Sequence, residues 1–254
     1  MALKSLSGKI ALVTGAGQNI GRGIALSLSA SGAIIAVNGR DNEGLVSDTV
    51  AEIKKNGGNA VGYMADISDP ISVKTLIDKI KSDLGGLDIL ICNAALNPFF
   101  GSSMDIPDDA FDKILNANIK SNHWLSNLVL PQMKERKDGS IIIISSIGGL
   151  KGSEMLGAYS ISKAADMQLV RNIAVEHGPD NIRANCISPG IVKTRFAQAL
   201  WDNPEILNKT TSRAPLRRIG EPDEIAGAAI YLSSEAGAFT TGQNIVIDGG
   251  VTIA

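Results

Sequence analysis

The sequence is poor in cysteine, with only two in 254 residues, Cys92 and Cys186. A structural metal site needs several ligands at short, regular spacing, and a disulfide framework needs more than one pair. Neither pattern is present, so we expect no metal site and no disulfide framework. Both cysteines fall in apolar stretches, and we expect them to be small buried residues in strands.

An excess of charge of either sign is also missing. The 24 basic and 26 acidic residues leave a formal net charge of −2, and the basic residues are scattered along the chain. Proteins that bind nucleic acid or an anionic membrane usually carry a basic patch. The charge pattern therefore argues against both kinds of partner.

Long apolar runs are absent as well. No stretch approaches the length of a membrane-spanning helix, and neither a secretory leader ahead of Gly8 nor a recognisable targeting signal at the carboxyl end is found. We therefore expect a soluble, cytoplasmic protein.

Apolar residues are nevertheless plentiful, at 44% of the chain. A chain of this length is long for one domain and short for two, and neither a linker nor an internal repeat divides it. We expect a single domain over residues 1–254.

Short apolar runs alternate with helical patterns along the chain. Strands are expected at 9–13, 33–37, 60–64, 87–92, 140–144, 182–187 and 244–247, and helices at 42–56, 70–84, 108–134, around Tyr159 and at 222–232. This alternation predicts an α/β fold, a doubly wound parallel sheet of Rossmann-like type, with helices on both faces and right-handed crossovers. A polar and aromatic segment over 193–213 fits neither pattern, and we expect it to form a flexible lid.

A glycine-rich turn, 14–23, follows the first strand and leads into a helical pattern. Its glycines let the backbone turn tightly and approach a pyrophosphate, and the exposed amides at the start of a helix favour negative charge. Strand, glycine turn and helix in this order predict a dinucleotide site.

Polar residues and glycines also follow the later strands, at 38–41, Asp66, 93–95, 145–146 and 188–190. Ligands of open parallel sheets bind outside the carboxyl ends of the strands, where the strand order reverses. We therefore expect a site at this edge of the sheet.

Tyr159 and Lys163 are four residues apart in a predicted helix, so they share one helix face. A nearby ammonium favours the phenolate and lowers the pKa of the tyrosine, which suits a proton donor and acceptor. The pair predicts acid–base catalysis by Tyr159.

Over nearly its whole length the chain resembles the short-chain dehydrogenase/reductase family. The resemblance rests on Gly15 to Gly21, Asp66, Asn93–Ala94, Asn118, Ser146, Tyr159, Lys163, Pro189–Gly190 and the closing stretch 247–250. It implies an oxidoreductase that moves a hydride between a nicotinamide cofactor and a carbonyl or secondary alcohol. It also implies a dinucleotide-binding half at about 1–135 and a catalytic half at about 136–254.

The resemblance assigns roles to four catalytic residues. Tyr159 is the general acid or base, and Lys163 lowers its pKa and holds the nicotinamide ribose. Ser146, thirteen residues before Tyr159, hydrogen-bonds the substrate oxygen, and Asn118 holds a water of a proton relay. The cofactor-binding residues that it implies are Gly15, Asn19, Ile20, Gly21, Arg40, Asp66, Ile67, Asn93, Tyr159, Lys163, Pro189, Gly190 and Thr194.

The chain departs from the family pattern at two places that bear on the cofactor. Asn19 stands where the family usually has glycine or alanine, and asparagine tolerates a positive φ better than most residues. Gly39 replaces the acidic residue typical of NAD-dependent members, and Arg40 follows it. Arginine can pair with a 2′-phosphate, so we predict NADP(H), with NAD(H) as the alternative because Asp41 could reach the ribose.

The substrate is predicted from the loops. Residues 97–101, 147–156 and a lid with Phe196, Leu200 and Trp201 offer apolar walls that suit a hydrophobic or cyclic ketone, and 94–101 resembles NADPH-dependent carbonyl and retinal reductases. Lys151, Glu154 and Arg195 could instead bind a polar or anionic group. The alternatives are a 3-oxoacyl-carrier-protein reductase, an NAD-linked sugar or polyol dehydrogenase and, outside the enzymes, a dinucleotide-sensing protein. The family resemblance further implies a homotetramer.

Overall fold

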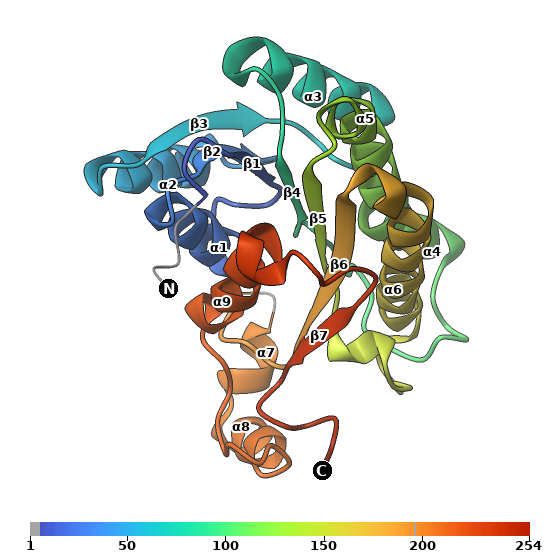
Figure 1. Ribbon diagram of the computed structural model, residues 1–254. Helices are drawn as coiled ribbons and strands as arrows, with labels where there is room; N and C mark the ends of the chain where they lie inside the picture. Colours follow the sequence, from blue (N-terminus) through green and yellow to red (C-terminus); the bar gives the residue numbers. More distant parts are fainter. Residues whose placement is uncertain (1–5, 196) are drawn as a thin grey trace.

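A seven-stranded parallel sheet forms the centre of the computed structural model, which describes residues 6–195 and 197–254 (Figure 1). Its strand order is β3-β2-β1-β4-β5-β6-β7. The strands are β1 Ile10–Val13, β2 Ile34–Gly39, β3 Asn59–Met64, β4 Ile89–Cys92, β5 Gly139–Ile144, β6 Ile182–Pro189 and β7 Asn244–Ile247. The predicted doubly wound fold is confirmed.

The middle strands are apolar on both sides because both faces of the sheet are covered. Every residue of β1, β4 and β5 is buried. Such continuous apolar runs are typical of central parallel strands. Cys92 in β4 and Cys186 in β6 are buried free thiols, as the sequence predicts.

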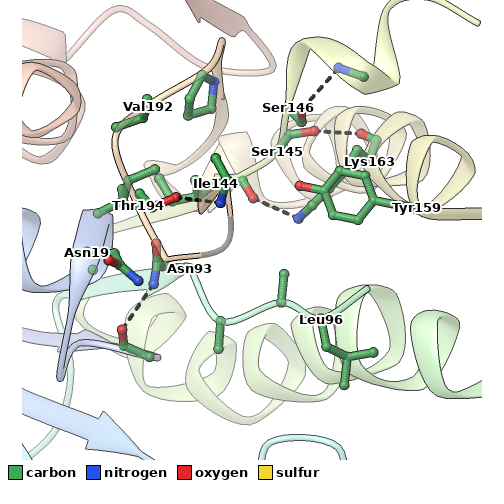
Figure 2. A pocket seen from close by; sticks show the side chains of 18 of the residues that line it. Asn19, Asn93, Leu96, Ile144, Ser145, Ser146, Tyr159, Lys163, Val192 and Thr194 are labelled. Carbon is green, nitrogen blue, oxygen red and sulfur yellow. Dashed lines mark hydrogen bonds between the residues drawn. The ribbon is translucent and has the colours of Figure 1, made fainter. Parts of the chain in front are cut away.

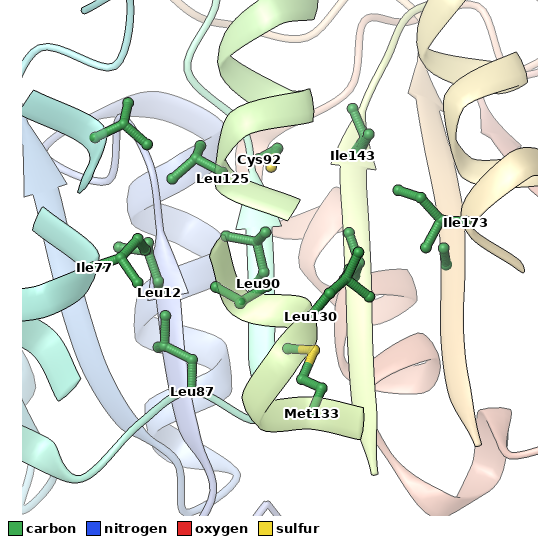
Figure 3. Packing of buried hydrophobic residues seen from close by; sticks show 14 of the residues in the cluster. Leu12, Ile77, Leu87, Leu90, Cys92, Leu125, Leu130, Met133, Ile143 and Ile173 are labelled. Carbon is green, nitrogen blue, oxygen red and sulfur yellow. The ribbon is translucent and has the colours of Figure 1, made fainter. Parts of the chain in front are cut away.

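Two helical layers cover the sheet (Figure 1). Helices α1 (Asn19–Ala30), α2 (Glu43–Lys55) and α9 (Pro222–Ser233) pack on one face. On the other face α3 (Pro70–Leu84), α5 (Ser121–Arg136) and α6 (Gly157–His177) bury Ile77, Leu125 and Ile173 against the strands (Figure 3). In the part of the chain that the structure describes, none of the helices is long and apolar enough to cross a bilayer.

The predicted helix over 108–134 is helical throughout, but it is not a single regular α-helix as the sequence predicts. It consists of α4 (Asp108–Leu115), a π-helical segment η1 (Asn116–Lys120) and α5. π-helical turns of this kind are often found at functional sites. Asn118 lies in the middle of η1, so the interruption falls on a residue of the predicted site.

The segment 193–213 is also more regular than predicted. It contains two short helices, α7 (Gln198–Trp201) and α8 (Pro204–Thr211), which lie beyond the sheet edge (Figure 1). Phe196, named above as part of the lid, lies outside the described residues. The flexibility of this segment stays a prediction.

The strand order reverses at the centre of the sheet, between β1 and β4. After β3 the chain returns across β2 and β1, and β4 pairs with β1 on its other side. The connections that leave β1 and β4 therefore diverge to opposite faces of the sheet, and a crevice opens between them at the carboxyl ends of the strands.

Candidate active site

A cavity of about 920 Å³ occupies the crevice at the carboxyl edge of the sheet. Residues at or just after the ends of all seven strands contribute to its walls. Tyr159 and Lys163 of α6 lie on one side of it (Figure 2). The residues that the family resemblance assigns to the cofactor all line it: Gly15, Asn19, Ile20, Gly21, Arg40, Asp66, Ile67, Asn93, Tyr159, Lys163, Pro189, Gly190 and Thr194. Ser146 lines the same cavity, whereas Asn118 lies behind its wall.

The glycine turn depends on residues that can adopt unusual backbone angles or lack a side chain. Gly15 has φ +64° and Asn19 has φ 54°, in the left-handed region that asparagine tolerates. A Cβ on Gly21 would come within 2.5 Å of both the Asn93 Nδ2 and the Gly15 carbonyl oxygen. The turn therefore packs too tightly for a side chain at Gly21.

Asn93 holds the glycine turn to the end of β4. Its Nδ2 donates to the Thr14 carbonyl oxygen at 2.8 Å, and its backbone N–H donates to the Thr14 Oγ1 at 2.9 Å. Asn93 therefore positions the backbone that faces the cavity, a structural role beside the cofactor contact that the sequence predicts.

The start of α1 fits an anionic group. Gln18, the residue before the helix, makes no side-chain capping bond, so the first amides of α1 are not covered by that side chain. Exposed amides at a helix start attract phosphate. Together with the volume of the cavity, this arrangement fits the pyrophosphate of a dinucleotide.

Arg40 lies at the far end of the same cavity, after β2. Its guanidinium pairs with Asp41, with Nε–Oδ1 at 2.7 Å and Nη2–Oδ2 at 2.6 Å. Both side chains are largely exposed, and an exposed ion pair contributes only about 0–1 kcal/mol. The pairing therefore leaves Arg40 able to exchange Asp41 for another anion.

Tyr159 and Lys163 stand on the first turns of α6, facing the end of β5 (Figure 2). The Lys163 Nζ lies 5.7 Å from the centre of the Tyr159 ring. It donates to the Ile144 carbonyl oxygen at 2.9 Å. Ser146 begins the short helix η2 (Ile147–Gly149), accepts the Gly148 amide at 3.0 Å and hydrogen-bonds the Tyr159 side chain.

The pKa of Tyr159 is raised in this environment, whereas the sequence predicts that Lys163 lowers it. Burial raises the pKa of the phenol most, the Lys163 ammonium and the Ser146 hydrogen bond lower it, and the Asp166 carboxylate raises it. The sign predicted for the effect of Lys163 is correct, but the predicted net shift is wrong.

Asp166 is the residue that sequence reasoning missed. Its Oδ2 lies 3.1 Å from the Lys163 Nζ, and the two side chains are 0% and 2% exposed. Lys163 and Asp166 are three residues apart, which places them on one helix face. This three-residue spacing is the feature of the sequence from which Asp166 could have been predicted as a partner of Lys163.

Asn118 makes contacts on three sides. Its Nδ2 donates to the Leu96 carbonyl oxygen and to the Ser162 Oγ at 3.1 and 3.0 Å, and its Oδ1 accepts the Leu96 amide at 2.9 Å. The backbone carbonyl oxygen of Asn118 accepts a hydrogen bond from the Asn122 Nδ2 at 2.7 Å. Asn118 thus ties the loop after β4 to α6, and its role in a water relay stays a prediction.

The walls at the substrate end match the prediction in part. Ile147, Lys151, Leu156 and Phe100 line the cavity, together with residues that follow β6. Trp201 does not: its Nε1 donates to the Thr194 carbonyl oxygen at 3.0 Å, and the Lys193 Nζ lies 5.9 Å from its ring centre. The tryptophan therefore packs against the start of its own segment.

A family model described as enoyl-(acyl carrier protein) reductase matches residues 15–252. The dehydrogenase/reductase SDR family member 4 of Bos taurus is 38% identical over 245 residues, which cover 96% of this chain and 88% of that protein.

Solved structures of dehydrogenases are also similar to the chain over nearly its whole length. A 7α-hydroxysteroid dehydrogenase complexed with NADH and 7-oxo glycochenodeoxycholic acid has a TM-score of 0.91 and 36% identity and covers 98% of this chain and 95% of its own. A gluconate 5-dehydrogenase from Burkholderia cenocepacia in complex with NADP and tartrate has a TM-score of 0.95 and 30% identity and covers 100% of both chains.

Proposed function

Because the chain belongs to the short-chain dehydrogenase/reductase family, we propose that the protein binds NADP(H) in this cavity and reduces a hydrophobic or cyclic ketone, with Tyr159 as the proton donor. The protein is an NAD(P)-dependent oxidoreductase that acts on CH–OH or C=O groups. The choice of NADP(H), the substrate and the residue roles are the parts that we propose. The observation that carries the residue roles is the meeting of Ser146, Tyr159 and Lys163 at one wall of the cavity.

The proposed mechanism assigns proton management to the chain's own residues. The bound nicotinamide supplies the hydride in reduction and accepts it in oxidation. Tyr159 gives a proton to the substrate oxygen in reduction and takes it back in oxidation. Ser146 donates a hydrogen bond to the same oxygen and stabilises the charge that develops there.

Lys163 supports the tyrosine in two ways. Its positive charge favours the phenolate, and of its three N–H donors two are directed at the Ile144 carbonyl and Asp166. The third is available for a ribose hydroxyl of the cofactor.

The preference for NADP(H) rests on Gly39 and Arg40. Gly39 brings no acidic side chain that would repel a 2′-phosphate, and Arg40 lies at the cavity's far end. A phosphate can replace Asp41 as the partner of the guanidinium, because the exposed pair is weak.

Two substitutions test the cofactor choice by titration of NADPH and NADH into the purified protein. Arg40→Ala should weaken NADPH binding about tenfold or more and leave NADH binding unchanged, since a charge-assisted hydrogen bond contributes about 1.5–3 kcal/mol. Asp41→Asn should strengthen NADPH binding, because it releases Arg40. A loss of NADH affinity in Asp41→Asn would instead indicate that Asp41 holds the ribose of NAD(H).

A second candidate substrate class is a hydroxy or keto acid of a sugar or polyol. Lys151, Arg195 and Arg213 line the cavity and could pair with a carboxylate. The similar gluconate 5-dehydrogenase was solved with tartrate, a hydroxy acid.

Initial rates separate the two classes. Aryl, cyclic and diketones, acyl thioesters and keto acids would be compared with saturating NADPH, and Lys151→Ala would be measured beside the wild type. Turnover of apolar ketones that Lys151→Ala leaves unchanged supports our proposal. Preferred turnover of keto acids, lost in Lys151→Ala, supports the second candidate, and cofactor binding without turnover of any substrate would indicate a dinucleotide sensor.

A further inference from the structure

We propose that Asp166 is a positioning residue for Lys163, which keeps the ammonium charged and in place and limits how much of its charge reaches Tyr159. This inference rests on the proposed roles of Tyr159 and Lys163. It concerns a residue outside the catalytic set that the sequence predicts.

Asp166 and Lys163 form a closed ion pair inside the protein. The Lys163 Nζ lies 3.1 Å from the Asp166 Oδ2, and neither side chain has more than 2% of its surface exposed. Two ions taken out of water are costly unless each finds a partner. An unpaired carboxylate at this position would destabilise the core. Asp166 and Lys163 therefore each supply the opposite charge that the other needs.

The carboxylate is itself held in place from α5. The Asn122 Nδ2 donates to the Asp166 Oδ1 at 2.9 Å and to the Asn118 carbonyl oxygen at 2.7 Å. Both Asn122 N–H groups are therefore used, one on Asp166 and one on η1. A continuous chain of polar contacts thus leads from Lys163 through Asp166 and Asn122 to Asn118.

The protonation of the pair follows from these contacts. Burial would lower the pKa of Lys163, but the Asp166 carboxylate, together with Tyr159 and Cys186, offsets this, and the pKa is raised. Lys163 therefore keeps its positive charge although it is buried. The same carboxylate raises the pKa of Tyr159 and so opposes the lysine there.

The other groups that face the pair come from several elements of the fold. Cys92 on β4 and Cys186 on β6 lie near it, and burial raises the pKa of both thiols. Arg171, farther along α6, lowers the pKa of Cys186 and so acts against burial there. Ser146 and Asn122 are neutral. Substitution of Asp166 leaves all of these groups in place, so a pH effect at Tyr159 that follows the substitution can be assigned to the Lys163–Asp166 pair.

The test is the pH dependence of alcohol oxidation by wild type and Asp166→Asn. Removing the negative charge lowers the pKa of both Tyr159 and Lys163. The acid limb of the rate profile, which follows Tyr159, and the basic limb, which follows Lys163, should therefore both move to lower pH, by about one unit or more. Glu176→Gln is the matched control: it removes one negative charge from the exposed end of the same helix and should leave both limbs in place.

A second readout needs no turnover. The chain has three tyrosines, and the tyrosinate absorbance of each variant, with that of its Tyr159→Phe counterpart subtracted, isolates Tyr159. Its titration should move to lower pH in Asp166→Asn. If this shift appears without activity, Asp166 acts as proposed although the catalytic role of Tyr159 is wrong.

If Asp166 has a purely structural role, Asp166→Asn should be less stable, but both limbs of the rate profile and the Tyr159 titration should stay at the wild-type pH. That result would overturn the proposal. If Asp166→Asn does not fold, Lys163→Met is compared with Lys163→Met/Asp166→Asn, since the double variant leaves no unpaired ion in the core. Tyr159 should titrate at lower pH in the double variant. Equal titrations would overturn the proposal.

Discussion

The Tyr159 hydroxyl is the proposed proton donor at the wall of the cavity. Tyr159→Phe removes it and keeps the ring, which is 9% exposed and part of the packing. Because general acid–base catalysis contributes about 10²–10⁴-fold, we expect kcat to fall by that factor while NADPH still binds. Steady-state rates and a cofactor titration measure the two effects.

Tyr231→Phe is the control for this change. Its hydroxyl lies 2.7 Å from the Thr240 Oγ1, away from the cavity, so its loss should leave kcat unchanged. A Tyr159→Phe enzyme that retained most of its activity would contradict the proposed mechanism.

At the scale of single residues, the sequence predicted which residues line the site better than it predicted the contacts between them. The positive φ of Asn19 could be predicted, because few residues other than glycine tolerate that region. The net pKa shift of Tyr159 could not, since it depends on burial and on Asp166, which the sequence shows only as one more acidic residue. Charge effects in a core depend on distances that a sequence does not contain.

The π-helical segment η1 is the element that joins three parts of the site. Asn118 within it bonds the backbone of Leu96 on one side and Ser162 of α6 on the other. Asn118→Ala would leave these buried groups without partners, each of which costs about 1–3 kcal/mol. We expect a loss of at least 1 kcal/mol in the free energy of unfolding, measured by urea denaturation.

Asn127 provides the comparison for Asn118, because it lies on α5 and is exposed. Its side chain contacts His123 on the surface. Asn127→Ala should therefore change the stability by no more than about 0.5 kcal/mol. Equal losses in the two variants would show that η1 is not held by the Asn118 contacts.

The π-helical segment η1 could not be predicted from the sequence. Apart from Pro131, residues 108–134 are compatible with an α-helix, and Asn118 within η1 contacts a loop 22 residues away in the chain. The short helices α7 and α8 were missed because the residues of 193–213 show no clear period. Elements set by long-range contacts are the ones that periodicity does not show.

The whole chain is expected to assemble as a tetramer. We expect assembly through the two long helices over 108–134 and 157–177 and through the carboxyl-terminal strand. Apolar side chains are exposed on two of these elements, with Val175 of α6 at 79% and Val246 of β7 at 38%. β7 is also an edge strand, whose unpaired side can meet another copy. Light scattering at micromolar concentration should give four times the 26.5 kDa chain mass.

Val246→Lys should weaken this assembly, since a charge on the edge strand opposes pairing. Lys74→Val on α3 changes an exposed residue outside the predicted interface and should leave the mass unchanged. A wild-type protein that scatters as a monomer would contradict the tetramer. The cytoplasmic location also stays a prediction.

The architecture was the most predictable level of the molecule. Each strand appears in the sequence as a short apolar run, because both faces of a parallel sheet are buried. The regular alternation with helices then restricts the topology to a few arrangements.

The strand order also determines when the site can form during synthesis. β1 is made early, but its neighbour β4 follows much later: the contact between Ile10 and Asp88 spans 78 residues. The first βα unit leaves the ribosome with one side of its central strand uncovered, and Tyr159 is translated after both. A nascent chain that already carries the glycine turn therefore has no catalytic wall to face it, and an interrupted translation product would be inert.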